Sequence, residues 1–409
     1  MRRKLTTFIV STCLIIGLLP TTVFAQSNSN EQVDLTISSS EELQEFAREV
    51  ASGNTYEGKI VKLTKDIKFD KSIRNNFTSI GRVYCMFSGT FDGAGYTISG
   101  IFQDLQSEYG GLFGYIGEKG IVKNVTLKDS LIRSVTNGGG IAFQNFGMIE
   151  NCHNKANISG FRVGGIVWEN KLGGTILNCS NSGTIMDAVD FGETTDIVGG
   201  IASYNSGTIA NSYNTGKVTS KIDGFTKMGG IVGINHHEHL SEYGTIKNCY
   251  NVGTVKSGIG VVEEMSGMIQ NVFYSKESVA PGKTYNRVGK KLTEKKMRTT
   301  SFVSILNKNR KNKTSWSKWE LNKSSKYPTF AKKYEVTFNE SELGYTKTNL
   351  SYAYRGQTVT LTAVPNENYK TSIITVKTVV GKKVNVKNIN GKYQFTMPNS
   401  KVIVTTTFN

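Results

Sequence analysis

The middle of the chain repeats itself. Gly-Gly followed by an apolar pair recurs with starts at Gly110, Gly139, Gly164, Gly199 and Gly229, which are separated by 29, 25, 35 and 30 residues. In the later copies a phrase of the form GTIxNCxNxG follows. A unit this short cannot bury an apolar face alone, whereas stacked units build a shared core. The sequence therefore predicts a solenoid.

The residue types of each unit favour strands over helices. Short β-branched runs are separated by Gly, Asn and Ser, and Pro is absent from residues 26–280. With roughly four glycines per unit, a helix would lose about 1 kcal/mol at each of them relative to Ala. The chain is therefore expected to be all-β, with a parallel β-solenoid as its main part.

In a parallel solenoid, equivalent side chains of successive coils lie above one another. Two inward apolar stacks are predicted, Ile141, Ile166, Ile201 and Ile231, and Ile149, Ile176, Ile209 and Ile246. Two columns of amides are expected to satisfy one another at turns, namely Asn151, Asn178, Asn211 and Asn248, and Asn154, Asn181, Asn214 and Asn251.

A further stack holds small residues, Cys152, Cys179, Ser212 and Cys249. We interpret these cysteines as buried free thiols, because stacked parallel Cβ vectors suit a disulfide poorly. A Cys152–Cys179 bridge or a redox role is the alternative. The cysteine pattern is unlike the dense framework of small disulfide-stapled domains.

The first 25 residues have the features of a secretory signal peptide. Arg2, Arg3 and Lys4 precede a short apolar run, and a small-residue cleavage site ends at Ala25. The apolar run is too short for a membrane span, and no later run approaches the length of about 20 residues that a span requires. We expect an exported chain without a transmembrane segment, secreted or held non-covalently at the bacterial cell surface.

The formal net charge of +17 is distributed unevenly. Residues 281–333 hold 16 Lys and Arg against two acidic residues, whereas residues 26–280 are net acidic. Two Trp lie in the basic stretch. Three interpretations stay open: a solvated face, a contact with an anionic polymer, and, least favoured for an exported chain, a contact with nucleic acid.

The repeat resembles a known family. GGLFG at Gly110–Gly114, followed by phrases such as GTILNCSNSG, is similar to the GLUG-motif repeat of exported bacterial surface proteins. Upstream, a Ser-capped amphipathic helix over Glu41–Val50 and a first strand at Lys59–Leu63 are expected. The resemblance implies a right-handed parallel β-helix at a cell surface and no single activity. The HExxH motif of surface proteases that carry such repeats is absent from the sequence.

The end of the chain resembles a second module. YRGQTVTLTAVPNENYK and YQFTMPNSKVIVTTTF are similar to the divergent internalin-type B repeat, a small all-β domain of exported proteins. The alternation of Val359, Leu361 and Ala363 independently fits a half-buried strand. The expected organisation is a signal peptide (1–25), an N-terminal capping helix with entry coils (26–105), GLUG-type repeats (106–280), a basic closing segment (281–332) and the β domain (333–409).

Two insertions in the repeats carry titratable residues. The first contains His236, His237 and His239 and is expected to be a polar turn, because a zinc site needs three or four converging ligands. The second contains Asp187, Asp190, Glu193 and Asp196, the candidate metal residues, for which calcium is the ion to consider. A solvated loop is the first interpretation of this second insertion, and no other cofactor is expected.

The leading functional hypothesis is a non-enzymatic, adhesin-like binding protein that contacts a glycan, an anionic wall polymer or host matrix. Six lysines of the basic segment are the candidate binding residues, namely Lys290, Lys291, Lys295, Lys296, Lys311 and Lys313. No catalytic residues are predicted. The alternative is a β-helix polysaccharide lyase or glycoside hydrolase that uses carboxylates in a solenoid groove.

Overall fold

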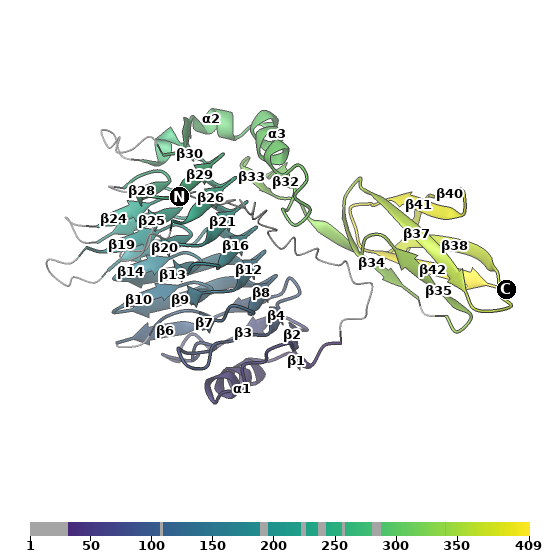
Figure 1. Cartoon of the computed structure of the whole chain (residues 1–409), viewed down its shortest axis with the longest axis horizontal. Helices are drawn as coiled ribbons and strands as arrows, with labels where there is room; N and C mark the ends of the chain where they lie inside the picture. The colour runs from purple at the N-terminus through teal and green to yellow at the C-terminus, as the bar shows by residue number, and fades with distance from the viewer. Residues whose placement is uncertain are drawn as a thin grey trace, which may run out of the picture.

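The computed structural model describes residues 32–106, 109–188, 195–221, 226–235, 243–255, 258–279, 288–339 and 341–409. Strands of successive coils stack into a parallel β-solenoid, and a small β domain lies beside it at the end of the chain (Figure 1). The predicted all-β fold, with a parallel solenoid as its main part, is confirmed. The right-handed sense of the coils stays a prediction.

Two parallel sheets run the length of the stack. Sheet 1 runs through β1 (Leu35–Ile37), β2 (Ile60–Leu63), β4 (Thr90–Asp92), β8 (Ile121–Lys123), β12 (Met148–Glu150), β16 (Thr175–Leu177), β21 (Thr208–Ala210), β26 (Thr245–Lys247) and β29 (Met268–Gln270). Sheet 2 runs through β3 (Ile67–Lys68), β5 (Thr97–Ser99), β9 (Thr126–Ser134), β13 (His153–Gly160), β17 (Ser180–Asn181), β22 (Tyr213–Asn214), β27 (Tyr250–Asn251), β30 (Phe273–Ser275) and β31 (Lys290–Leu292). Beside sheet 2 lie β6 (Phe102–Leu105), β18 (Ile185–Asp187) and β23 (Val218–Ser220), and a short 3-10 helix, η1 (Lys276–Ser278), follows β30.

The other side of the coil is closed by two sheets that meet at a sharp corner. Sheet 3 runs through β7 (Phe113–Ile116), β11 (Ala142–Asn145), β15 (Val167–Asn170), β20 (Ala202–Asn205), β25 (Val232–Asn235) and β28 (Val262–Met265). Sheet 4 runs through β10 (Asn137–Gly139), β14 (Arg162–Gly164), β19 (Ile197–Gly199) and β24 (Lys227–Gly229).

The repeated Gly-Gly pair lies at this corner. A Cβ atom added at Gly199 would lie 1.7 Å from the carbonyl oxygen of Ala202, and one at Gly200 would lie 2.1 Å from that of Gly230. No side chain fits at either distance, because the backbone of the same coil approaches Gly199 and the backbone of the next coil approaches Gly200 too closely. The pair is therefore a steric requirement of the turn between sheets 4 and 3.

The predicted apolar stacks form the solenoid core. Ile141, Ile166, Ile201 and Ile231 are fully buried, and the backbone N–H of each of the first three donates to the carbonyl oxygen of the next at 2.8 Å. In sheet 1 the strand register pairs Ile149 with Ile176, Ile176 with Ile209, and Ile209 with Ile246. Both stacks are confirmed in the predicted register.

The cysteine stack consists of free, fully buried thiols. The backbone N–H of Cys152 donates to Cys179 Sγ at 3.5 Å, and that of Ser212 donates to Cys249 Sγ at 3.4 Å. Burial raises the pKa of the Cys249 thiol to about 12. Because the thiolate is the reactive form, these cysteines are suited to packing and not to nucleophilic chemistry. The free-thiol interpretation is confirmed.

Stacked asparagines tie each coil to the next. In the column predicted at Asn154, Asn181, Asn214 and Asn251, each Nδ2 donates to the next Oδ1 at 2.8–2.9 Å, and every side chain is fully buried. An equivalent ladder that the sequence reasoning missed ends the strands of sheet 3. It consists of Asn145, Asn170, Asn205 and Asn235, which are joined at 2.7–2.8 Å.

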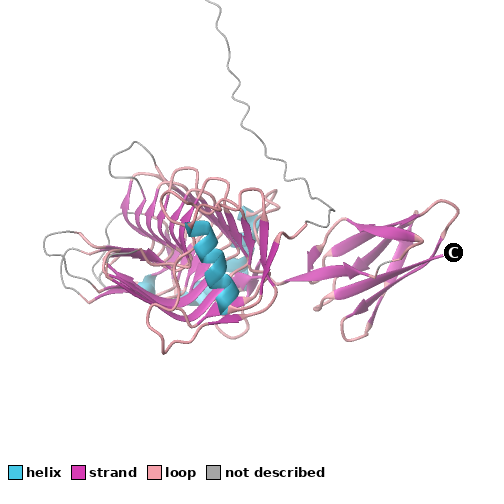
Figure 2. Ribbon diagram, turned by 90° about the horizontal axis from the view of Figure 1, so that it is seen from below, coloured by secondary structure: helices cyan, strands magenta, loops and turns pink. Residues whose placement is uncertain are grey.

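Helix α1 (Ser40–Ala51) closes the first coil. Ser39 is its N-cap and accepts a hydrogen bond from the Glu42 N–H at 3.1 Å. The buried face carries Leu43, Phe46, Ala47 and Val50, the spacing of one side of a helix. In Figure 2, α1 lies across the end of the stack. It therefore covers apolar surface that the first coil would otherwise expose.

The terminal domain is built from two small sheets. One has the order β36 (Tyr352–Tyr354), β34 (Lys333–Phe338), β42 (Val402–Phe408), β38 (Thr371–Thr378), β39 (Lys383–Val384), and the other has the order β35 (Gly344–Thr348), β37 (Thr358–Pro365), β41 (Lys392–Thr396), β40 (Val386–Ile389). Val359, Leu361, Val402 and Val404 are buried in its core. The alternation found in the sequence therefore does face a separate core.

Candidate functional site

The basic closing segment begins where the solenoid ends. Lys290 and Lys291 lie on β31, which pairs with β30 as the last strand of sheet 2. Lys295 and Lys296 lie on α2 (Glu294–Met297), and Lys311 and Lys313 follow α3 (Thr300–Asn309). All six lysines are exposed. They lie on β31, on α2 and in the segment that follows α3, and Figure 1 shows α2 and α3 together at one end of the solenoid.

The short helices orient these lysines because their apolar residues are buried against the solenoid. Thr293 caps α2 by accepting a hydrogen bond from the Lys296 N–H at 3.2 Å. Met297, Phe302 and Leu306 then pack with Tyr250 and neighbouring aromatic residues in one cluster. The charged positions between the buried ones are left facing solvent.

Not every basic residue of the segment is available to a ligand. Arg298 binds Glu294 at 2.8 Å and donates to the Tyr327 hydroxyl at 3.0 Å. Arg310 Nε donates to the Trp316 carbonyl at 3.0 Å. Both arginines therefore hold the segment together. The sequence alone does not distinguish such structural arginines from arginines that are free to bind a ligand.

Lys313 differs from the other five candidate lysines. Its ammonium lies 3.9 Å from the centre of the Trp316 ring, a cation–π contact. Partial burial lowers the pKa of Lys313, and the nearby charge of Lys247 contributes. Trp316 itself packs on Leu177 and Ala210 of sheet 1. Lys313 is therefore partly engaged by the protein.

Residues 300–330, which we call the clasp, run back along the side of the solenoid. The clasp consists of α3, a connecting segment and the hairpin of β32 (Trp319–Leu321) and β33 (Pro328–Phe330). It binds three successive asparagines of the first predicted column: Asn178 accepts from Ser317 N–H at 2.8 Å, Asn211 accepts from Trp319 Nε1–H at 2.7 Å, and Asn248 accepts from Asn309 Nδ2–H at 3.0 Å.

This column therefore has a second role besides the predicted one. Asn248 donates to Asn211 at 2.8 Å, and Asn211 donates to Asn178 at 2.7 Å, so mutual satisfaction is confirmed there. Asn178 then donates to the carbonyl oxygen of Ser315 at 2.8 Å, and Asn151 donates to Asn124 instead. The ladder is therefore interrupted between Asn178 and Asn151.

Aromatic packing completes the attachment of the clasp to sheet 2. Trp319 is 1% exposed and packs against Tyr213, Tyr250 and Phe330, with ring centres 4.6–5.7 Å from its own. At the edge of this cluster, His153 lies 6.0 Å from the Phe330 ring and 2.9 Å from Ser180 Oγ. The two tryptophans of the basic segment are thus structural.

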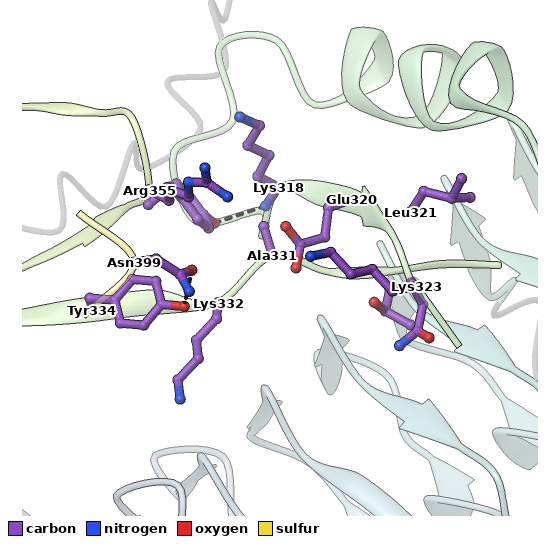
Figure 3. A pocket seen from close by; sticks show the side chains of 12 residues that line it. Lys318, Glu320, Leu321, Lys323, Ala331, Lys332, Tyr334, Arg355 and Asn399 are labelled. Carbon is purple, nitrogen blue, oxygen red and sulfur yellow. Dashed lines mark hydrogen bonds between the residues drawn. The ribbon is translucent and has the colours of Figure 1, made fainter. Parts of the chain in front are cut away.

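A cavity of about 320 Å³ opens where the β32–β33 hairpin meets the terminal domain. We call it the junction pocket. Its lining includes four basic side chains, one carboxylate, two tyrosines and two amides: Lys318, Lys323, Lys332, Arg355, Glu320, Tyr334, Tyr354, Asn322 and Asn399. Figure 3 shows Arg355 and Lys318 on one side, Glu320 and Lys323 on another, and Lys332, Tyr334 and Asn399 below them.

Sequence reasoning missed this pocket. Its residues come from both sides of the junction, and Arg355 belongs to the terminal domain, outside the basic segment. They meet because Lys333 of β34 pairs with Tyr354 of β36 in an antiparallel register that composition does not show. The available signal was the turn sequence Tyr354-Arg355-Gly356-Gln357, which marks an exposed arginine at the start of a strand.

The candidate metal residues are separated by the limits of the described chain. Asp187 is fully buried, and its Oδ2 accepts hydrogen bonds from Ser220 at 2.7 Å and Thr226 at 3.0 Å. Asp196 is also buried, whereas Asp190 and Glu193 lie outside the described residues. Within those residues no group of three or more His, Cys, Asp and Glu side chains could hold a metal ion. The calcium site stays a prediction.

The histidine insertion gives no geometry to assess, because His236, His237 and His239 lie outside the described residues. The structure does describe the strands on either side of this insertion. Asn235 ends β25 with its side chain in the missed ladder, and Thr245 begins β26. Its interpretation as a polar turn stays a prediction.

The fold defines a β-solenoid repeat protein with a terminal β domain. Residues 159–186 match the GLUG motif, and residues 334–409 match the divergent InlB B-repeat domain, which confirms both resemblances over these ranges. Domains of these kinds are typical of bacterial surface and secreted proteins. None of the helices that the structure describes is long and apolar enough to cross a membrane.

A search of solved structures finds similarity to one titled IgA1 Protease. It covers 66% of this chain and 24% of that protein, at 18% identity and a TM-score of 0.43. The chain therefore spans about a quarter of that protein's length. No curated protein sequence matches the chain.

Proposed function

We propose that the chain is an exported, non-enzymatic binding protein that contacts anionic polymers of a cell wall or host surface through its basic closing segment. The observation that supports this proposal is that the apolar and the basic residues of the segment face in different directions. Its aromatic and apolar residues are buried against the solenoid, whereas Lys290, Lys291, Lys295, Lys296 and Lys311 are exposed on the surface they create. A rigid array of exposed cations attracts a polyanion without a fixed sequence or a pocket.

The proposal predicts retention that depends on salt. Exposed charges are screened over about 8 Å at physiological ionic strength, so retention on a sulfated glycan or an anionic wall polymer falls between low and moderate salt. Basic residues at anionic membrane surfaces contribute about 1 kcal/mol each. With three lysines engaged at a time, a polymer should bind about 100-fold more weakly after their removal.

The test replaces all six candidate lysines with Gln, including Lys313. The matched control replaces six exposed lysines of the terminal domain with Gln, so that both variants lose the same charge: Lys370, Lys377, Lys382, Lys383, Lys387 and Lys392. Retention on immobilised heparin and on purified wall polymer is measured against salt. The proposal predicts a loss in the first variant and retention in the second. Equal losses would assign binding to overall charge and overturn it.

The same incubation separates binding from catalysis. The length of the soluble polymer is followed by gel filtration after prolonged contact with the protein. A binding protein leaves the chain length unchanged, whereas a lyase or hydrolase shortens it. Shortening by the purified protein would replace the proposed function with the enzymatic alternative.

A further inference from the structure

The junction pocket has a composition that surface lysines alone do not provide. Among the described residues that line it, four are cationic and one is a carboxylate, and all four cations are exposed. An excess of like charge around one small cavity disfavours an empty state and favours an anion inside it. The lining also contains two tyrosines, so the cavity offers aromatic surface beside its charges.

Arg355 is held at the pocket by a tight turn. The Gln357 N–H donates to the Tyr354 carbonyl at 2.9 Å, and Gly356 between them has a φ of 81°. A type II turn requires that left-handed conformation at its third residue, which glycine adopts without strain. Arg355 therefore occupies the second position of a defined turn at the end of β36, where the guanidinium is presented on a fixed backbone.

The two tyrosines are also fixed, and Tyr354 links the two sides of the pocket. The Tyr354 hydroxyl accepts a hydrogen bond from the Lys318 N–H at 2.8 Å, across the junction. The Tyr334 hydroxyl donates to Asn399 Oδ1 at 2.6 Å, within the terminal domain. Both rings are partly exposed. A tyrosine held in this way combines an apolar face with a polar edge, which suits the face and hydroxyls of a sugar ring.

We propose that the junction pocket binds an acidic sugar unit, in which a carboxylate or phosphate contacts Arg355 and the surrounding lysines and the ring lies against the tyrosines. Both anions present the oxygens that a guanidinium binds through two parallel hydrogen bonds. The cavity of about 320 Å³ lies at the lower end of the range of about 300–1,000 Å³ that small-molecule sites occupy. The cavity therefore takes a single sugar unit or the end of a chain. This proposal is independent of the proposed contact between the six lysines and a polymer.

The experiment titrates the purified protein with glucuronate, with glucose 6-phosphate and with glucose, using calorimetry or ligand-observed NMR. Binding of either acidic sugar with no binding of glucose supports the proposal, and the stronger of the two identifies the anion. Equal binding of glucose would show that charge is not recognised. Failure of both acidic sugars to bind at millimolar concentration would also overturn the site.

Single substitutions locate the binding. Arg355→Gln and Lys332→Gln each remove one charge from the pocket, and Lys392→Gln is the control on an exposed strand of the same domain. A hydrogen bond to a charged group contributes about 1.5–3 kcal/mol, so each pocket variant should bind at least about tenfold more weakly. The control should bind as the wild type does. Thermal unfolding of all three verifies that they are folded.

The pocket and the polymer surface can be told apart. The six-lysine variant should keep its affinity for the acidic sugar even where it loses retention on polymer. The Arg355→Gln variant should lose affinity for the acidic sugar and keep its retention on polymer. An Arg355→Gln variant with wild-type affinity for the sugar would place the ligand elsewhere and refute the inference, whatever the outcome for the polymer.

Discussion

Asn211 is the residue at which the clasp and the solenoid depend on each other most directly, so Asn211→Ala is an informative perturbation. Its side chain is fully buried and takes part in four hydrogen bonds. It donates to Asn178 at 2.7 Å and to the carbonyl oxygen of Ser317 at 3.0 Å, and it accepts from Asn248 at 2.8 Å and from Trp319 Nε1–H at 2.7 Å. Alanine removes all four bonds at once.

The expected cost can be estimated contact by contact. Asn178 still accepts from Ser317 N–H, and Asn248 still donates to the Leu306 carbonyl, so neither amide is left without a bond. Trp319 Nε1–H loses its acceptor while buried, which costs about 1–3 kcal/mol. Asn211 has a φ of 48°, a conformation that costs alanine about 1–2 kcal/mol. Together the free energy of unfolding should fall by about 2–5 kcal/mol.

The matched control is Asn271→Ala. Asn271 occupies the same position in the coil beyond the last asparagine that the clasp binds, and its φ of 56° imposes the same backbone strain. Urea unfolding is followed in a Trp168→Phe background by tryptophan emission, which then reports Trp316 and Trp319 of the clasp, and by far-UV circular dichroism, which reports the coils. Asn211→Ala should be less stable than the control by about 1–3 kcal/mol, with the emission change preceding the loss of strand signal. Equal losses in the two variants would refute the reasoning, because the hydrogen bonds to the clasp would then contribute nothing.

Two further perturbations test the core and the acid response. Ile201→Asp places an unpaired charge in a fully buried stack and should unfold several coils in thermal denaturation, whereas Ile201→Val should cost about 0.5–1.5 kcal/mol; an unchanged melting temperature for the Asp variant would mean that the register is wrong. Burial, with a contribution from Lys155, lowers the pKa of His153 from 6.5 to about 4, so the unfolded chain binds the proton more tightly than the folded one. The stability that neutral His153 provides is therefore complete above pH 6.5 and is lost as the pH falls toward 4, by at most about 3 kcal/mol. Urea unfolding of His153→Gln between these pH values should lack this component, and an identical pH profile would contradict the assignment.

The solenoid could be predicted because the same sequence pattern recurs in each of its units. Ile176 and Ile209 occupy the same place in similar phrases, so a shared register follows from alignment of the units alone. The ladder that includes Asn145 and Asn205 was missed, although each of its members lies six residues after the first glycine of its unit. Aligning the units on the glycine pair, and not on the later GTI phrase, would have revealed it.

The clasp and the junction pocket could not be predicted in the same way. The bond between Trp319 and Asn211 joins residues 108 positions apart, and nothing local in either segment specifies it. Arg298 and Lys295 look alike in the sequence, yet one is held by Tyr327 and the other faces solvent. Which cations of a basic stretch are free is decided by packing, and packing between unlike segments has no periodic signal.

The attachment of the clasp limits how the solenoid can change in length. Asn178, Asn211 and Asn248 belong to consecutive coils, and each binds its own point on the clasp. Strands of neighbouring coils are about 4.8 Å apart, so loss or gain of one whole coil in this span would displace the remaining contacts by that distance. Coils between α1 and His153, whose ring lies 6.0 Å from that of Phe330 in the clasp, carry no such restriction. The clasp thus fixes the number of coils at the C-terminal end of the solenoid. Duplication or deletion of repeats should be tolerated only toward the end that α1 covers.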